Sequence, residues 1–287
     1  MKKSTATLLL CLFIAVSAMA QDNSLQVMTF NIRYNNAGDS INAWPNRIEK
    51  VSSQVLFHHP HILGVQEALW GQITDLSAVL TQYKHVGVGR DDGDKKGEFS
   101  AIFYDTTRLM LLDTKTFWLS ETPDKVGSKG WDAQLPRIVT YARFKDRKTK
   151  KEFYHFNTHF DHRGKIARRE SAKLLLQKVN EIAGKVPAVI TGDFNAKPND
   201  EPIEVIVDAQ NPLHLKDAKP LSKIPHYGPN STFNSFGPKE IGNEPIDYIF
   251  LKGGNWTVWQ HACITQSWAG LFASDHFAQL ATLTLGK

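Results

Sequence analysis

The chain has 287 residues, of which 41% are hydrophobic and 22% are charged, a balance typical of a globular protein with a sizeable core. This composition excludes a wholly disordered chain, and a formal net charge of +5 is too small to indicate a nucleic-acid-binding protein by itself. No repeat or linker divides the sequence after its first 20 residues, so we expect one domain over residues 21–287.

Residues 1–20 have the composition of a secretory signal peptide. Lys2 and Lys3 precede an apolar stretch, and small residues lead up to Ala20. The apolar stretch is too short to span a bilayer comfortably, which disfavours a membrane anchor, and no later stretch predicts an integral membrane span. We therefore predict cleavage near Ala20 and export to the periplasm or the extracellular space. Without the two lysines, 32 basic and 29 acidic residues remain, a net charge of +3.

The rest of the chain alternates between strand patterns and helix patterns. Strands are indicated by short runs of apolar and β-branched residues, and helices by apolar residues at a spacing of three or four. The expected strands are residues 25–32, 62–67, 99–104, 109–119, 138–144, 153–159, 188–193, 246–251, 256–259 and 277–285. The expected helices are residues 45–57, residues 73–80, and a helix marked by apolar residues over 172–182 with Arg168 and Arg169 in its first part.

Three polar segments interrupt these elements. Residues 87–97 are rich in glycine and charge, which predicts an exposed loop that could reach over a site. Residues 145–151 predict the solvated basic tip of a hairpin, for which phosphate binding is the less favoured interpretation. Residues 211–244 are full of Pro, Gly, Ser and Asn and predict a long connecting segment that faces the substrate.

Polar side chains follow several of the expected strands at the point where each strand ends. Residues 188–195 show this most clearly, because a buried strand pattern ends in Asp193 and Asn195. An ordinary strand-to-turn exit would use the same residue types. The same arrangement recurs at Asn31, Glu67 and His159, however, and the recurrence favours a site over a turn.

Two further polar groups stand near the starts of later strands. They are Asp247, which lies in an apolar context, and the Asp275-His276 pair. If the later strands run opposite to the earlier ones, all of these groups meet at one edge. We therefore expect two packed mixed sheets with helices outside.

Six short motifs resemble those of the endonuclease/exonuclease/phosphatase superfamily. This superfamily includes pancreatic-type deoxyribonucleases, abasic-site endonucleases, deadenylases, neutral sphingomyelinases and inositol-polyphosphate phosphatases. The motifs stand in order as Thr-Phe-Asn31, Val-Gln-Glu67, Asn-Thr-His159, Gly-Asp193-Phe-Asn195, Ile-Asp247-Tyr-Ile and Ser-Asp275-His276. The resemblance spans the chain from residue 21 and implies a four-layer α/β/β/α sandwich that hydrolyses a phosphate ester with a divalent cation, usually Mg²⁺.

The resemblance also implies a metal site. Mg²⁺ prefers hard oxygen ligands and keeps several waters, and Mn²⁺ is a plausible substitute. The implied metal-site residues are Glu67, with Asn31 close by and Asp275 as a further contributor. Asp193 would orient or deprotonate the attacking water, and Asn195 would donate a hydrogen bond to the phosphate.

Two histidines complete the implied chemistry. His276 would contact the phosphate while Asp247 fixes its tautomer and favours its charged form. His159 would stabilise or protonate the leaving oxygen.

Three other side chains have weaker claims to a role. Arg90, Arg163 and His162 are candidates for substrate binding, and each is equally compatible with a structural role.

Alternatives remain open for the function. A secreted nuclease acting on DNA or RNA is one, although Cys263 is the only cysteine after residue 20, so the disulfides of pancreatic-type relatives cannot form, and no concentrated basic groove is evident. A non-catalytic exported binding protein is another, yet it would be expected to have lost some of the convergent polar groups. The favoured interpretation is a monomeric, exported, metal-dependent phosphoesterase whose substrate the sequence does not identify.

Overall fold

The computed structural model describes residues 23–237 and 242–286 and contains two six-stranded sheets that pack face to face. The predicted signal peptide lies outside the described residues. The first sheet contains, in spatial order, β11 (Trp256–Ile264), β14 (Ala278–Leu285), β1 (Leu25–Asn31), β2 (Ile62–Ala68), β4 (Phe99–Asp105) and β3 (Tyr83–Val86). The second contains β5 (Leu109–Trp118), β6 (Ile138–Asp146), β7 (Glu152–His159), β8 (Ala188–Asp193), β10 (Asp247–Lys252) and β9 (Lys216–Asp217).

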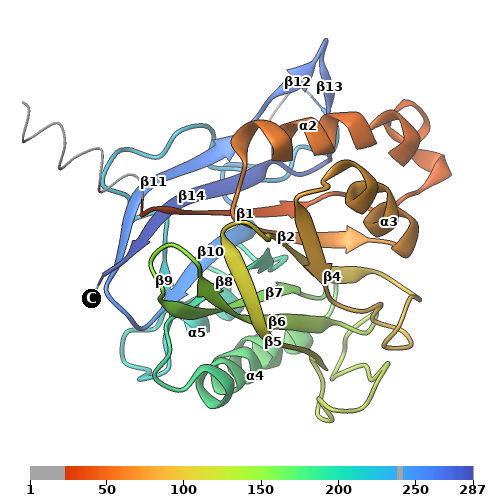
Figure 1. The fold of residues 1–287 in the computed structure, drawn as a ribbon. Helices are drawn as coiled ribbons and strands as arrows, with labels where there is room; N and C mark the ends of the chain where they lie inside the picture. The colour runs from red at the N-terminus through yellow and green to blue at the C-terminus, as the bar shows by residue number, and fades with distance from the viewer. Residues whose placement is uncertain (1–22, 238–241, 287) are drawn as a thin grey trace, which may run out of the picture.

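Helices cover the outer faces of both sheets (Figure 1). Helices α2 (Ile48–His58) and α3 (Trp70–Val79) pack on the first sheet, and α4 (Lys165–Ala183) and α5 (Glu201–Val207) pack on the second. Short 3₁₀ helices η1 (Ala37–Asn42) and η2 (Trp44–Asn46) precede α2, and a small hairpin of β12 (Ser267–Trp268) and β13 (Leu271–Phe272) follows β11. This confirms the predicted four-layer α/β/β/α sandwich.

Strand direction brings the polar groups to one edge. Strand β2 runs parallel to β1, and β8 runs parallel to β7. Asn31 at the end of β1 donates to Asp193 at the end of β8, so these four strands end at the same side of the sandwich. Strands β14 and β10 run antiparallel to β1 and β8, so they begin where the others end. The expected reversal of the later strands is therefore present.

Side-chain alternation explains why this edge is polar. On β8, Val189 packs in the core between the sheets, while Thr191 and Asp193 occupy the next positions on the same face. On β1, Val27 packs in that core, and Thr29 and Asn31 follow it. The interior between the sheets therefore changes from apolar to polar along the strands.

Two helices differ from the sequence prediction. Helix α4 begins at Lys165, a few residues before the Arg168 and Arg169 that were expected in its first part, because the Asp132 carboxylate accepts the backbone N–H groups of Ile166 and Ala167. This carboxylate caps the first turn from a distant loop. Helix α5 is not among the helices that the sequence predicts, and it buries Ile203 and Ile206 against the second sheet. No helix among the described residues is long and apolar enough to cross a membrane.

Candidate active site

Three candidate residues form one row on the second sheet. The strand pairing places His159 beside Asp193 and Asp193 beside Asp247, and all three side chains are buried. The Asp193 carboxylate lies 3.5 Å from His159 Nε2 and 3.8 Å from His276 Nε2. Burial raises the pKa of Asp193, and the nearby Asp247 carboxylate raises it further.

Glu67 reaches the row from the facing sheet because strand β2 is irregular at its end. The pairing of β2 with β4 shifts between Val65 and Ala68, and Glu67 adopts a positive φ of 64°. A bulge of this kind re-aims side chains that regular alternation would place on the other face. A non-glycine residue in this conformation is uncommon and often marks a functional position.

Asn31 joins the two sheets. Its amide nitrogen donates to Glu67 Oε1 at 3.0 Å and to Asp193 Oδ2 at 2.9 Å, while its Oδ1 accepts the backbone N–H of Arg33. Glu67 Oε2 accepts the backbone N–H of Tyr34. Asn31 therefore presents its donor side to the carboxylates, and it fixes both of them in place.

His276 and Asp247 form a buried pair. His276 Nδ1 lies 2.9 Å from Asp247 Oδ2, and the Phe233 ring packs edge-on against the imidazole at 5.0 Å between centroids. Burial opposes the charged imidazolium, but Asp247, followed by Asp193, raises the pKa of His276 well above its usual value. The imidazolium is thus stable, and its Nε2 faces Asp193.

Asp275 completes the acidic edge. Its carboxylate accepts from the Ser274 hydroxyl at 3.2 Å and lies 3.9 Å from Arg33 Nε. Burial raises the pKa of Asp275, and the Glu67 carboxylate adds to the increase. Converging buried carboxylates of this kind repel one another, and a bound divalent cation would offset the repulsion.

The residues present fit such a cation. Atoms of Glu67, His159 and Asp193 that can ligate a metal lie within 4.8 Å of one another, and of these three Glu67 is the side chain implied as a metal ligand. Carboxylate oxygens dominate this edge, which suits Mg²⁺ or Mn²⁺ better than a soft metal.

His159 differs from His276 in its charge. Its Nε2 lies 3.0 Å from Asn195 Nδ2, and its Nδ1 lies 3.6 Å from Glu98 Oε2. Burial, followed by the charge of Arg137, lowers the pKa of His159 to about 3. Since Asn195 Nδ2 can only donate, the neutral ring accepts at Nε2 and carries its proton on Nδ1, toward Glu98.

The three weaker candidates lie around this histidine, in different environments. Arg90 is buried and makes two hydrogen bonds to Glu98, at 2.6 and 2.9 Å. His162 is exposed, and its Nδ1 lies 3.0 Å from Arg137 Nη2. Arg163 is exposed on the same turn.

Sequence reasoning missed Glu98 and Arg137, although a signal for both was present. Each residue stands immediately before a strand, β4 and β6 respectively, and both strands run antiparallel to a neighbour that ends at the site. The rule that located Asp247 and Asp275 at strand starts therefore applies to Glu98 and Arg137 as well. The expected substrate-facing segment 211–244 does reach the site, because Phe233 contacts His276 and the Asn234 backbone N–H bonds to Asp275.

A buried polar network lies directly below the site and crosses between the sheets. Asn157 Nδ2 donates to the backbone oxygens of Val65 and Ala101, each at 2.9 Å. Its Oδ1 accepts from Gln66 Nε2 at 2.7 Å and from the Thr191 hydroxyl at 2.9 Å. One side chain of the second sheet thus holds two strands of the first, including the strand that carries Glu67.

Known proteins resemble the chain over most of its length. The model of the endonuclease/exonuclease/phosphatase family matches residues 28–276. Among curated proteins of Drosophila melanogaster, Protein angel is 27% identical over 177 residues and Nocturnin is 25% identical over 239 residues. These matches cover 58% and 72% of this chain, and they span 47% and 35% of those two proteins, so the chain covers about half or less of the length of either.

Solved structures agree with the family match. An endonuclease/exonuclease/phosphatase from Bacteroides vulgatus is 42% identical, with a TM-score of 0.87 over 92% of this chain and 99% of its own. A mannosyl-6-phosphatase from Bacteroides thetaiotaomicron is 38% identical, with a TM-score of 0.85 over 91% of this chain and 100% of its own. The human Nocturnin catalytic domain, at 18% identity and a TM-score of 0.73 over 92% of this chain and 95% of its own, shares the fold. The chain belongs to the endonuclease/exonuclease/phosphatase family, whose members are divalent-metal-dependent enzymes that hydrolyse phosphoester bonds.

Proposed function

We propose that this protein is an exported, Mg²⁺-dependent phosphatase that hydrolyses the phosphate monoester of a sugar. The observation that carries the hydrolytic chemistry is the row of His159, Asp193 and Asp247, which faces Glu67 and His276. The choice of a sugar phosphate is supported by the 38% identity with the mannosyl-6-phosphatase over nearly all of both chains. Export is supported by the signal-peptide pattern of residues 1–20.

Glu67 and Asp275 would hold the metal, and Asn31 would fix the Glu67 carboxylate through its amide N–H. When bound, the cation would supply polarisation of a phosphate oxygen and neutralise developing negative charge. The need for it is supported by the burial that raises the pKa of Asp275 and by the repulsion that the nearby Glu67 carboxylate adds.

Asp193 would orient and deprotonate the attacking water. Its raised pKa makes the carboxylate a stronger base, and the backbone N–H of Asn195 at 2.9 Å and the Asn31 amide fix its two oxygens. The water gives one proton to Asp193 and attacks phosphorus, and the bond between phosphorus and the sugar oxygen breaks. The sugar oxygen takes up a proton from solvent and leaves as a hydroxyl, and Asp193 then returns its proton to solvent.

His276 would donate a hydrogen bond to a phosphate oxygen as a stable imidazolium, because Asp247 holds its Nδ1 proton. His159 is neutral and carries its proton on Nδ1, toward Glu98, so we assign it the role of holding Asn195 toward the phosphate; in this tautomer it has no N–H to offer the leaving oxygen. Arg90 and Arg137 would add positive charge beside His159, and Arg163 and His162 would contact the rest of the substrate from the surface.

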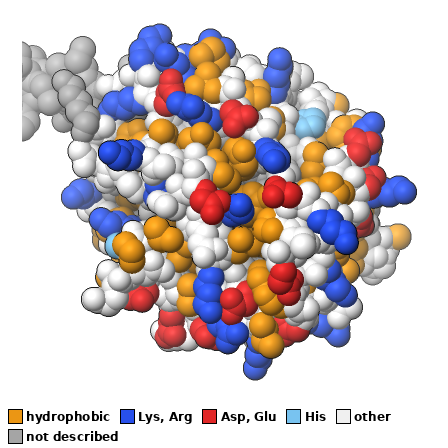
Figure 2. Space-filling view, turned by 90° about the horizontal axis from the view of Figure 1, so that it is seen from below, with side chains coloured by type: hydrophobic (Ala, Val, Ile, Leu, Met, Phe, Trp, Pro, Cys, Tyr) orange, Lys and Arg blue, Asp and Glu red, His pale blue; other side chains and the backbone are white. Residues whose placement is uncertain are grey.

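A nuclease is the alternative that the same chemistry would serve. Basic and acidic side chains are interspersed on the face seen in Figure 2 and do not gather into a basic strip. A protein that binds duplex or single-stranded nucleic acid usually has such a basic strip. On the face that Figure 2 shows, therefore, the distribution of charge does not favour a nucleic acid.

The test is a panel of substrates assayed with Mg²⁺: mannose 6-phosphate, glucose 6-phosphate, an inositol polyphosphate, a phospholipid, and DNA and RNA oligonucleotides. We expect the highest kcat/KM on a sugar phosphate. Faster cleavage of an oligonucleotide would reject the phosphatase assignment in favour of a nuclease. Absence of turnover on every substrate would favour a binding protein.

A further inference from the structure

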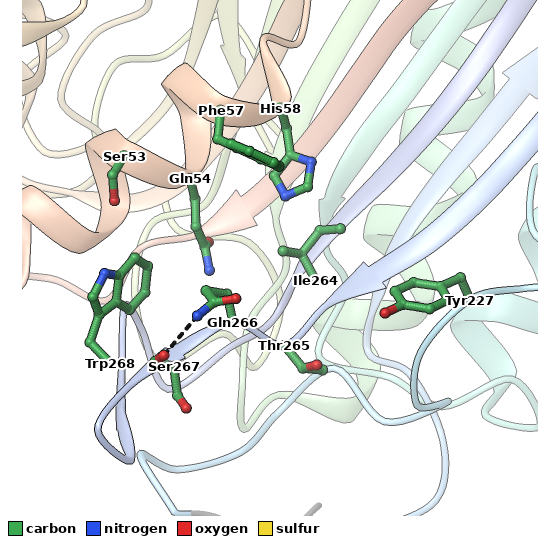
Figure 3. A pocket seen from close by; sticks show the side chains of 10 residues that line it. All are labelled: Ser53, Gln54, Phe57, His58, Tyr227, Ile264, Thr265, Gln266, Ser267 and Trp268. Atoms are coloured by element: carbon green, nitrogen blue, oxygen red, sulfur yellow. Dashed lines mark hydrogen bonds between the residues drawn. The ribbon is translucent and has the colours of Figure 1, made fainter.

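A groove outside the candidate active site lies between helix α2 and the end of strand β11. Its volume is about 590 Å³, within the usual range of small-molecule sites. Figure 3 shows the aromatic side chains of Phe57, Tyr227 and Trp268 around it, with the amides of Gln54 and Gln266 between them. Ile264 lines the groove and pairs with Ala278, two residues after His276, so the groove adjoins the edge of the sheet that carries the site.

None of the side chains that line the groove carries a permanent charge. None of its lining side chains is Lys, Arg, Asp or Glu, although the chain contains 34 basic and 29 acidic residues. Its one titratable side chain with a shifted pKa is His58, and burial lowers that pKa, so the ring is neutral at pH 7. A charged ligand would therefore find no partner here, in contrast to the acidic and cationic groups of the candidate active site.

Aromatic faces are exposed along the groove. Phe57 is 83% exposed and Tyr227 is 74% exposed, whereas Trp268 packs partly against the core below α2. Exposed aromatic residues in a concave setting mark a binding surface. The π-face of an aromatic ring is negative, so it attracts the weakly positive C–H face of a sugar ring.

The groove also has a polar group directed into it. Gln54 is 5% exposed, and Figure 3 shows its amide nitrogen directed into the groove, toward Gln266. Its Oε1 is shielded from solvent and makes no hydrogen bond among the described residues. The amide nitrogen can donate to a hydroxyl of a ligand. Gln266 Nε2 donates to the Ser267 backbone oxygen at 2.8 Å, which holds a second amide at the groove.

We propose that this groove binds a neutral saccharide, namely the unphosphorylated part of a mannose-containing glycan. The aromatic faces, the paired amides and the absence of charged lining side chains together match a carbohydrate better than an anion or a basic peptide. The choice of mannose rests on the proposed function. Binding at the groove itself does not, because a neutral sugar carries no phosphate and needs no catalysis.

The probe is neutral α-linked mannotriose, titrated into the purified protein by calorimetry. We expect saturable binding that weakens about fivefold to tenfold in Phe57→Ala and in Tyr227→Ala, because each loses one stacking face. Both side chains are exposed, so folding is not at risk. Trp259→Ala is the matched control, since Trp259 is a 41% exposed aromatic residue of β11 outside the groove. This variant should bind mannotriose with the affinity of the wild type.

Gln54→Met separates recognition from packing. Methionine keeps the length of the side chain and removes the amide, so a merely structural Gln54 would leave mannotriose affinity unchanged. We expect the affinity for mannotriose to fall by about fivefold or more, because one hydrogen bond to a ligand hydroxyl is lost. Turnover of free mannose 6-phosphate should stay at the wild-type level in all four variants.

Three results would overturn the groove assignment. The first is no mannotriose binding by the wild type at tens of millimolar, and the second is binding that Phe57→Ala, Tyr227→Ala and Gln54→Met all leave unchanged. The third is a concentration-dependent dimer in sedimentation that Phe57→Ala abolishes, because a second copy would then occupy the groove. Inactivity on mannose 6-phosphate alongside mannotriose binding would reject the proposed function and leave the groove standing.

Discussion

At the scale of single residues, the site depends on charges that are set by burial. His276 and His159 are both buried and both lie within 4 Å of the Asp193 carboxylate, yet the pKa of His276 is raised and that of His159 is lowered to about 3. The difference arises because Asp247 pairs with His276, whereas burial acts on His159 without an equivalent partner and Arg137 adds positive charge. One histidine is therefore a cation and the other a neutral ring.

Asp247→Asn tests this assignment through pH dependence. In the wild type the raised pKa keeps His276 charged through neutral pH, and the charge is lost only as pH rises through that pKa. Removing the carboxylate lowers the pKa of His276, so the alkaline limb of kcat/KM should move to lower pH, and turnover at neutral pH should fall by about 10²-fold. Asp217→Asn, a carboxylate of β9 with no contact to His276, should leave the pH profile unchanged. An unshifted alkaline limb in Asp247→Asn would contradict the pairing.

At the scale of elements, most of the candidate site could be predicted from the strand pattern of the sequence. The residues that could not be predicted depend on tertiary contacts. Asn31, Glu67 and Asp193 were visible because polar groups follow apolar runs in the sequence. Glu98 and Arg137 were not recognised, because each stands before a strand and reaches the site only through antiparallel pairing, of β4 with β2 and of β6 with β7 respectively. Likewise, the first turn of α4 depends on a carboxylate from another loop, which no local pattern reveals.

The hydrogen bonds of Asn157 hold strand β2, which carries Glu67, against the second sheet. Asn157→Ala leaves the carbonyl oxygens of Val65 and Ala101 without this donor, and each buried group without a partner costs about 1–3 kcal/mol. We expect the free energy of unfolding to fall by about 2–4 kcal/mol in a urea titration. Metal affinity should weaken as well, because β2 carries Glu67.

Thr116→Val is the control for Asn157→Ala. It removes one hydroxyl pair with Thr140 at 3.1 Å on the part-exposed edge of the second sheet, and it should cost less than about 1 kcal/mol. Equal destabilisation by the two variants would contradict the special role of the network.

At the scale of the whole molecule, buried neutral histidines link stability to pH. Burial lowers the pKa of His61 to about 4 and those of His155 and His261 to about 3. In the unfolded chain these groups titrate near 6.5, so unfolding takes up protons below that pH. Asp217 acts in the opposite direction, because burial raises its pKa to about 6 and the folded state holds its proton.

Stability should therefore fall as pH drops from about 6.5 toward 4, because the groups whose pKa is lowered outnumber those whose pKa is raised. The seven histidines with a lowered pKa are His58, His61, His85, His155, His159, His162 and His261, and the four opposing groups are Asp193, Asp217, Asp275 and His276. The measurement is the urea midpoint at pH 7.5, 6 and 5. His155→Gln should reduce the dependence of the urea midpoint on pH, because it removes one of the groups that take up a proton on unfolding. A midpoint that rises on acidification would show that the carboxylate contributions dominate and would contradict the prediction.

The central claim is that the converging carboxylates hold a divalent cation and that Asp193 activates water beside it. The most direct test is hydrolysis of mannose 6-phosphate by the protein after dialysis against a chelator, with Mg²⁺ or Mn²⁺ then added back. We expect activity to disappear and to return with either metal in the wild type. Asp193→Asn should remain about 10²–10⁴-fold slower at saturating metal while unfolding at an unchanged or higher temperature. Turnover that survives the chelator, or near-normal turnover in Asp193→Asn, would contradict the account.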